Sequence, residues 1–497
     1  HLNQIFVNRA MDFNSVTFGI FFCIIILLYW LVFNHPRRLV MRNAFILAVS
    51  YLFYGWWDWR FLSLIAMSSL VDFFVGLQLG NTEASLSQRR RWLVLSLAVN
   101  LGMLGAFKYF NFFIESADAA LSVIGLSATG LRLEWILPVG ISFYTFQTLS
   151  YTLDIFRGQL KPVKDPISFF AFVAFFPQLV AGPIERAKLL LPQFNQFHQF
   201  DSKSVKSGML LVIWGLFKKI VIADRLAFYV NNAYALGPEE LNGPIALTAV
   251  VFFTLQLYVD FSAYSEIAIG LARMLGFKLS TNFRRPLLAN GFADLWARWH
   301  ISLTTWFRDY LMLPLRRMPN GQKRRGFNVM IVFFVTGLWH GANWTFVLWG
   351  LVNGGFLLLF EPLVIRPLYR LPVVVSRILR TGFTTIFMYG ALVLFRAPDM
   401  ASAATIYSAI FDWSEASLAL GSQLKISVNE WRICWLSVIG LLSFEALQEL
   451  KPKLEVTFFE GVGLKRWVTT WTLVMAILLL GSYGVFVLDK QFIYFQF

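Results

Sequence analysis

Two histidines on apolar stretches are the residues of this sequence best suited to chemistry. His340 lies within residues 326–360, a run without formal charge, and His300 lies within residues 295–303, which are rich in tryptophan. A buried neutral imidazole has a pKa near neutrality, so it can act as a general base. It can also be structural, bonded to a backbone carbonyl or packed among aromatic rings. Position alone favours neither role for His340 and favours packing for His300.

The place of His340 in its segment indicates that it lies deep. A helix that starts at Arg325 puts His340 roughly 22 Å along its axis, at about 1.5 Å per residue. The hydrocarbon core of a bilayer is about 30 Å thick. The uncharged run is too long for one crossing, and Gly341 and Asn343 are natural points for a break. We therefore expect His340 at a helix end that faces an internal cavity.

The segment around His300 has the pattern of an amphipathic helix at the membrane interface. On such a helix His300 lies on an aromatic face that points inward. That face comprises Trp296, Trp299, His300, Leu303, Phe307 and Tyr310, whereas Arg298, Thr305 and Asp309 fall largely on another.

A further polar group occupies residues 258–266, where Asp260, Tyr264 and Glu266 interrupt an apolar region. These side chains could form a wall of a substrate cavity. They could instead form a polar network between helices, in which a carboxylate pairs with an arginine such as Arg284 or Arg298. The pattern favours the network.

Other chemistries lack the residues that they need. The remaining histidines, His1, His35 and His198, lie at the terminus or in charged or polar loops, so a zinc site would lack a third ligand. Cys23 and Cys434 lie in apolar surroundings and are expected to be buried small hydrophobic residues. Neither a GxSxG elbow nor a P-loop is present. We expect no metal and no permanently bound cofactor.

Composition predicts an all-α integral membrane protein. Of the 497 residues 57% are hydrophobic and 14% are charged, whereas soluble domains are about 25% charged. The net charge of +15 is better explained by basic cytoplasmic loops than by nucleic acid. The basic runs 37–38, 89–91 and 323–325 lie at the ends of apolar spans, as that rule expects.

The apolar segments predict about eleven to thirteen membrane-embedded helices. Some are too short to cross alone, such as 210–217, which is bounded by Lys206 on one side and by Lys218 and Lys219 on the other. Such pieces favour re-entrant segments around a central tunnel. We expect one membrane domain over residues 11–497, a non-native extension over 1–10, and a surface loop with one amphipathic helix over 399–429. The apolar segments are 18–33, 45–53 continuing toward 79, 92–107, 137–149, 169–180, 210–217, 245–259, 261–275, 329–340, 344–360, 381–395, 435–447 and 471–487.

Several motifs together resemble the membrane-bound O-acyltransferase family. The segment 296–310 is similar to the family signature, and 337–344 is similar to its catalytic-histidine motif. Further similarity lies in 54–57, 176–184, 258–270 and 395–398. The chain length and the residues of these motifs resemble the bacterial branch that acetylates alginate, cellulose or peptidoglycan. A shorter relative of that branch acts in teichoic-acid D-alanylation. The segment 262–266 departs conservatively from the commoner pattern, which weakens an assignment to alginate.

The resemblance implies a fold, an activity and a set of site residues. It makes His340 the catalytic histidine and His300 a second active-site residue, with supporting roles for Trp299, Arg308, Asp309 and Asn343. It implies acetyl-CoA as the cytoplasmic acyl donor and the bacterial inner membrane as the location. The implied partners are membrane lipid, a periplasmic SGNH-type acetyltransferase or esterase, and a polysaccharide-synthesis complex.

Two other classes of function compete with the acyltransferase. A transporter also uses broken helices and a polar site at the membrane midplane, but neither inverted repeats nor buried charges are clear in this sequence. A non-catalytic scaffold of a polymer synthase would keep its activity after both histidines were replaced. Acyl transfer by the purified protein would separate these alternatives.

Overall fold

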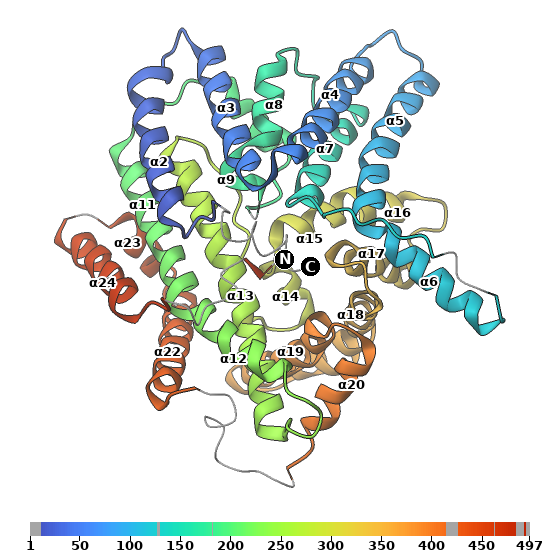
Figure 1. Cartoon of the computed structure of the whole chain (residues 1–497), viewed down its shortest axis with the longest axis vertical. Helices are drawn as coiled ribbons and strands as arrows, with labels where there is room; N and C mark the ends of the chain where they lie inside the picture. The colour runs from blue at the N-terminus through green and yellow to red at the C-terminus, as the bar shows by residue number, and fades with distance from the viewer. Residues whose placement is uncertain are drawn as a thin grey trace. The chain divides into compact units, whose positions relative to one another are not determined.

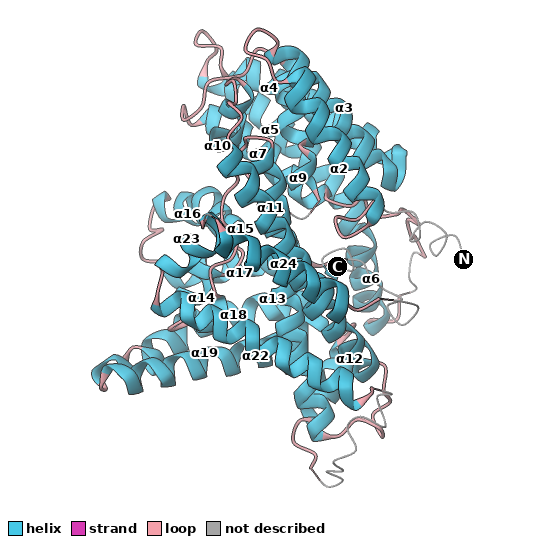
Figure 2. Ribbon diagram, turned by 90° about the vertical axis from the view of Figure 1, so that its left-hand side faces the viewer, coloured by secondary structure: helices cyan, strands magenta, loops and turns pink. Residues whose placement is uncertain are grey.

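A computed structural model describes residues 11–126, 130–180, 182–413, 426–461, 463–483 and 492–493. Within these ranges the chain forms helices and loops and contains no strand (Figure 2). The structure therefore confirms the predicted all-α class. The expected extension over 1–10 lies outside the described residues.

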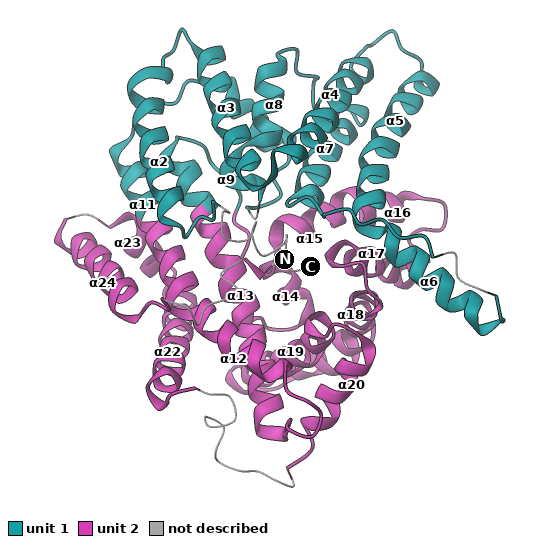
Figure 3. Ribbon diagram, in the orientation of Figure 1, with its two compact units in different colours: residues 1–209, 268–280 teal, residues 210–267, 281–497 magenta. Residues whose placement is uncertain are grey.

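The chain divides into two compact units (Figure 3). Unit 1 comprises residues 1–209 and 268–280, and unit 2 comprises residues 210–267 and 281–497. Both histidines of interest lie in unit 2. The expectation of a single membrane domain stays a prediction.

Unit 1 is built from antiparallel and broken helices of apolar composition (Figure 1). Several begin at side-chain caps that bind the free N–H groups of the first turn. Ser85 and Gln88 form a capping box, and Asp165 caps a helix whose first residue is proline. The helices are α2 (Val16–Leu28), α3 (Leu39–Asp58), α4 (Leu62–Leu79), α5 (Leu86–Leu104), α6 (Phe110–Val123), α7 (Ile141–Phe156), α8 (Pro166–Ala174), α9 (Phe176–Leu179) and α10 (Ala187–Phe194).

Buried polar side chains connect the elements of unit 1. Arg42 is fully buried, and its guanidinium donates to the carbonyl oxygens of Phe194 and Gln196. His198, which the sequence placed in a polar loop, is also buried; its ring contacts the Tyr29 hydroxyl at 3.2 Å. Burial, with the nearby Arg42 charge, lowers the pKa of His198 to about 4. This histidine is therefore a neutral structural residue at physiological pH.

Unit 2 holds the two histidines within a set of short and long helices. It contains α12 (Asp224–Tyr234), α14 (Phe292–Arg298), α15 (Ile301–Phe307), α16 (Leu313–Arg317), α17 (Arg325–His340), α18 (Trp344–Gly355), α19 (Val373–Arg396), α20 (Met400–Ala409), α22 (Val428–Leu450), α23 (Lys453–Glu460) and α24 (Leu464–Leu480). Two more helices, α11 (Ser202–Phe217) and α13 (Gly243–Met274), give residues to both units.

Seven helical segments of the described chain are long and apolar enough to cross a membrane, or eight if the bent pair α23–α24 is one span. Shorter helices that enter the membrane without crossing it are not among these segments, so the expected eleven to thirteen membrane-embedded helices stay a prediction. The helix in the 399–429 segment is α20, and residues 414–425 lie outside the described part.

Three predicted segment boundaries were wrong. The segments 245–259 and 261–275 form one helix, α13, of 32 residues, because Asp260 pairs with a buried lysine and does not end the helix. Residues 137–140 precede α7, since Gly140 has φ +77°. Residues 169–180 divide between α8 and α9 at Phe175.

Lys218 and Lys219 do not bound a short apolar segment as predicted. They lie on a wide helical turn that joins α11 directly to α12, and both side chains are 2% exposed. Lys219 pairs at 2.9 Å with Asp224 and with Asp260, and Lys218 pairs at 2.9 Å with Glu266. Buried charges are tolerated when they are paired in this way. The predicted polar network is thus present, but its cations are lysines and not Arg284 or Arg298.

The two cysteines differ in their surroundings. Cys434 is buried, as expected, whereas Cys23 is exposed on α2. Helix α2 is apolar and is one of the candidate membrane spans, so an exposed face on it is suited to lipid and requires no burial inside the protein.

Candidate active site

The hairpin of α17 and α18 positions His340. Helix α17 ends at His340, and Gly341 continues in extended backbone. Asn343 then caps α18, because its Oδ1 accepts from the backbone N–H of Thr345 at 3.0 Å. The predicted helix end and break are confirmed. His340 therefore stands at the C-terminus of α17, where the chain turns back.

Glycines bring the two helices of this hairpin into close contact. A Cβ on Gly337 would collide with the backbone of Phe346, and a Cβ on Gly350 would collide with the backbone of Phe333. Small residues permit such close packing of membrane helices. The approach of α18 to α17 thus depends on the absence of these two side chains, and it holds the end of α17 in place.

Aromatic rings enclose the imidazole of His340. The ring of Trp349 lies edge-on at 5.0 Å and that of Phe395 at 5.1 Å between centroids, and Trp339 is next to it at 4.9 Å. The residue is 5% exposed. Edge-to-face contacts of this kind are favourable and restrict the orientation of a ring.

His340 lines a small cavity in unit 2. Its volume is about 20 Å³, which is room for roughly one water molecule. Asn353 supplies a polar side chain without an aromatic ring to the wall; its Nδ2 donates to the Trp349 carbonyl at 2.8 Å. The walls are Leu257, Leu295, Trp296, Trp299, His340, Trp349, Asn353, Met388, Ala391, Leu392 and Phe395.

His300 does not lie within a continuous amphipathic helix, and that prediction was wrong. Helix α14 ends at Arg298 and α15 begins at Ile301; His300 between them has φ +42° and ψ +53°. A residue with a Cβ avoids this left-handed conformation, at a cost of order 1–3 kcal/mol. The backbone N–H of Ile301 donates instead to the carbonyl of Asn282 at 2.8 Å. A tertiary hydrogen bond therefore takes the place of the helical one.

The two histidine rings share one aromatic neighbour. The Trp339 indole lies 5.9 Å from the His300 ring and 4.9 Å from the His340 ring, between centroids. His300 is 1% exposed and also contacts Phe261 at 4.7 Å. The structure thus brings the two candidate catalytic residues into contact with the same indole.

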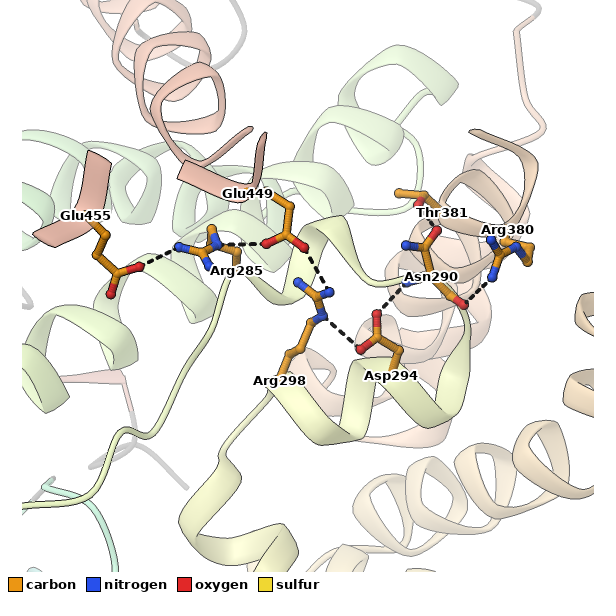
Figure 4. A network of polar contacts seen from close by, with 8 residues as sticks. All are labelled: Arg285, Asn290, Asp294, Arg298, Arg380, Thr381, Glu449 and Glu455. Carbon is orange, nitrogen blue, oxygen red and sulfur yellow. Dashed lines mark hydrogen bonds and ion pairs between the residues drawn. The ribbon is translucent and has the colours of Figure 1, made fainter. Parts of the chain in front are cut away.

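An ion-pair network supports the turn that carries His300 (Figure 4). Glu449 on α22 accepts from Arg285 at 2.9 Å and from Arg298 at 3.0 Å. Arg298 also pairs with Asp294 at 2.9 Å, and Arg285 with Glu455 at 2.7 Å. These pairs tie α14 and the preceding loop to α22 and α23. Arg298 is therefore a structural residue of this turn.

The predicted supporting residues have different surroundings. Trp299 lines the His340 cavity. Arg308 and Asp309 pair with each other at 2.7 Å on exposed surface, and the cavity wall includes neither. Asn343 caps α18 and donates to the Pro398 carbonyl at 2.6 Å, so its contacts are those of a structural cap near His340.

Sequence reasoning missed Asn282 and Asn353. Asn353 carried a signal, because it is a polar side chain inside the uncharged run 326–360. Asn282 carried none: it is separated from His300 by 18 residues and lies outside any periodic pattern. Its contact with His300 depends on the tertiary fold.

The fold and the site together define a multi-pass helical membrane protein with a buried histidine centre. Residues 124–397 match the family model described as MBOAT, membrane-bound O-acyltransferase family. The chain belongs to the membrane-bound O-acyltransferase family, and it is an O-acyltransferase. This result supersedes the transporter and scaffold alternatives.

Relatives with named activities align over much of the chain. A "Probable alginate O-acetylase AlgI" of Pseudomonas putida is 37% identical, over 92% of this chain and 94% of the relative. A "Peptidoglycan O-acetyltransferase" of Helicobacter pylori is 31% identical, over 78% and 77%. A "Teichoic acid D-alanyltransferase" of Bacillus subtilis is 25% identical, over 43% and 56%. The activities in these names are those of the bacterial branch that the motifs resemble.

Proposed function

We propose that this protein takes an acetyl group from cytoplasmic acetyl-CoA and passes it across the membrane for O-acetylation of an exopolysaccharide or cell-wall polymer, such as alginate, cellulose or peptidoglycan. The observation that carries the proposal is the imidazole of His340 at the end of α17, which lines a cavity between the α17–α18 hairpin and helices α13, α14 and α19. Two relatives are named as an alginate O-acetylase and a peptidoglycan O-acetyltransferase, which supports acetyl as the acyl group that is transferred.

The chemistry requires one basic nitrogen at the thioester. As a general base, His340 removes the proton of the acceptor hydroxyl; the hydroxyl oxygen attacks the thioester carbonyl, the C–S bond breaks, and the proton goes to the thiolate. As a nucleophile, His340 attacks the carbonyl itself, releases the thiol and then gives the acetyl to the hydroxyl. Both routes use the same imidazole, and we leave both open.

Charge on the loops of unit 2 supports a cytoplasmic donor. At one set of helix ends the connecting segments and first turns carry Arg366, Arg370, Lys451 and Lys453. At the other ends, residues 235–242 and 397–427 carry one basic residue, Lys425. Basic loops face the cytoplasm. Acetyl-CoA is anionic, so a basic face would also attract it.

The acceptor side of the proposal includes partners. A periplasmic SGNH-type acetyltransferase or esterase would receive the acetyl group and place it on the polymer, within a polysaccharide-synthesis complex. The location would be the bacterial inner membrane. The similarity to alginate and peptidoglycan acetylases supports this arrangement. Assays with alginate, cellulose and peptidoglycan oligosaccharides would identify the acceptor.

The decisive variant is His340→Ala. The variant should fold and insert, because the glycine contacts between α17 and α18 and the Asn343 cap that hold this helix end do not involve the imidazole. Acetyl transfer from labelled acetyl-CoA in proteoliposomes should fall by about 10²–10⁴-fold, the contribution of a general base. Asn353→Ala, at the same cavity, should keep a measurable rate. Wild-type transfer by His340→Ala would refute the role of this histidine.

A further inference from the structure

Asn282 contacts the His300 turn through both its backbone and its side chain. The Asn282 carbonyl accepts from the N–H of Ile301 at 2.8 Å, and the neighbouring N–H of Arg284 donates to the Arg298 carbonyl at 2.9 Å. These two bonds flank His300. They compensate for the left-handed backbone that His300 adopts.

The Asn282 side chain reaches the imidazole directly. Its Oδ1 lies 3.0 Å from Nδ1 of His300, and the same oxygen accepts from the Ser302 hydroxyl at 2.9 Å and the Ser302 N–H at 3.3 Å. On the other side, Nδ2 donates to the Ser265 hydroxyl on α13 at 3.0 Å. Asn282 is 1% exposed, so water does not compete for these contacts.

The orientation of this amide follows from its partners. The backbone N–H of Ser302 can only donate, so the amide atom that faces it must be the oxygen. That oxygen is an acceptor only, and it faces Nδ1 of His300. Nδ1 must therefore carry the hydrogen. In the neutral imidazole the lone pair then belongs to Nε2.

We infer that Asn282 is a positioning residue for the acyl transfer: it fixes His300 as the Nδ1–H tautomer and leaves Nε2 as the basic nitrogen of the second histidine. The inference rests on the proposed function, in which His300 assists His340. An orienting acceptor of this kind determines which ring nitrogen can exchange a proton. Asn282 itself acts through His300.

A series of variants separates positioning from simple structural support. Asn282→Ala removes the acceptor and should lower kcat for acetyl transfer by about 10²-fold or more, with KM for acetyl-CoA changed less. Asn282→Asp keeps an acceptor oxygen of the same reach and should restore a large part of kcat. The matched control is Ser265→Ala, which removes only the partner of Nδ2 and should change kcat by less than about threefold.

A double variant tests the pathway of the effect. If Asn282 acts through His300, Asn282→Ala should add nothing to the loss caused by His300→Ala. Losses that multiply in the double variant would overturn the inference. Equal losses in Asn282→Ala and Asn282→Asp, with KM changed as much as kcat, would also overturn it. Either result would leave the proposed function intact. Wild-type activity of His300→Ala would instead remove His300 from the mechanism. Should Asn282→Ala fail to fold, the Asp variant and its double with His300→Ala decide the same question.

Discussion

The walls of the His340 cavity set the size of the group that can reach the imidazole. Aromatic rings form much of the wall, and an aromatic ring cannot change its shape. Met388 on α19 is an exception, because its side chain is unbranched and adaptable. It is 7% exposed and lines the cavity. If the acetyl group occupies this space in the reaction, Met388 is the residue most suited to limit acyl length.

Replacing Met388 should relax the choice of acyl donor. Met388→Ala removes three heavy atoms from the wall, so a propionyl group gains room. Its transfer relative to acetyl should rise by about tenfold or more, since one methylene in an apolar pocket changes specificity by about 10–200-fold. Competition between acetyl-CoA and propionyl-CoA would measure this ratio. The control is Ile386→Ala on the same helix, whose side chain is 68% exposed; a similar ratio in both variants would argue against acyl selection at Met388.

At the scale of single residues, the sequence could predict His340 better than His300. The break after His340 follows from local signals, a glycine and a capping asparagine, and the structure has it there. The turn at His300 has no local signal, because its left-handed backbone depends on hydrogen bonds to Asn282. Helical periodicity therefore predicted a continuous helix where the tertiary fold requires a turn.

At the scale of elements, the α17–α18 hairpin depends on backbone contact. Gly350 lies against the backbone of Phe333 and Gly337 against that of Phe346. Neither neighbour can move as a flexible side chain would. The end of α17 carries His340, so any shift between these helices moves the imidazole relative to the cavity wall.

Adding one methyl group at this contact should therefore cost both stability and activity. Gly350→Ala should lower the free energy of unfolding by about 1–3 kcal/mol, the usual cost of overpacking, and should reduce acetyl transfer. Gly355→Ala on the same helix is the control, because a Cβ there meets nothing within 4 Å. Thermal unfolding in detergent would compare the two variants. Equal midpoints would show that α18 can separate from α17 without loss.

Charged residues within helices were the hardest feature to predict at this scale. Lys218, Lys219 and Asp260 looked like boundaries of apolar segments, yet each lies inside a continuous helical run. Asp224 is near Lys219 in the sequence, but Lys219 also pairs with Asp260, and Lys218 pairs with Glu266, both on α13. A local window cannot show these two long-range pairs.

At the scale of the whole molecule, the loop charges of unit 2 predict a direction for the chain in the membrane. The stretch that precedes α22, residues 397–427, carries a single basic residue, Lys425, whereas α22 ends next to Lys451 and α24 begins near Lys465 and Arg466. The positive-inside rule predicts that Lys451 and Lys465 are on the cytoplasmic side. Residues 235–242 would then lie outside. The proposed direction of acetyl transfer requires this orientation.

Thiol labelling can test the orientation. In a background with Cys23→Ala and Cys434→Ala, a membrane-impermeant maleimide added to intact cells should label Glu239→Cys within minutes and leave Lys453→Cys unlabelled. Permeabilisation should make both react, because Glu239 lies in the loop before α13 and Lys453 is the first residue of α23, at opposite ends of the spanning helices. The reverse pattern would place the acidic 235–242 loop in the cytoplasm. Acetyl-CoA would then have to approach the face that has fewer basic residues, and the proposed donor side would be wrong even if His340 remained essential.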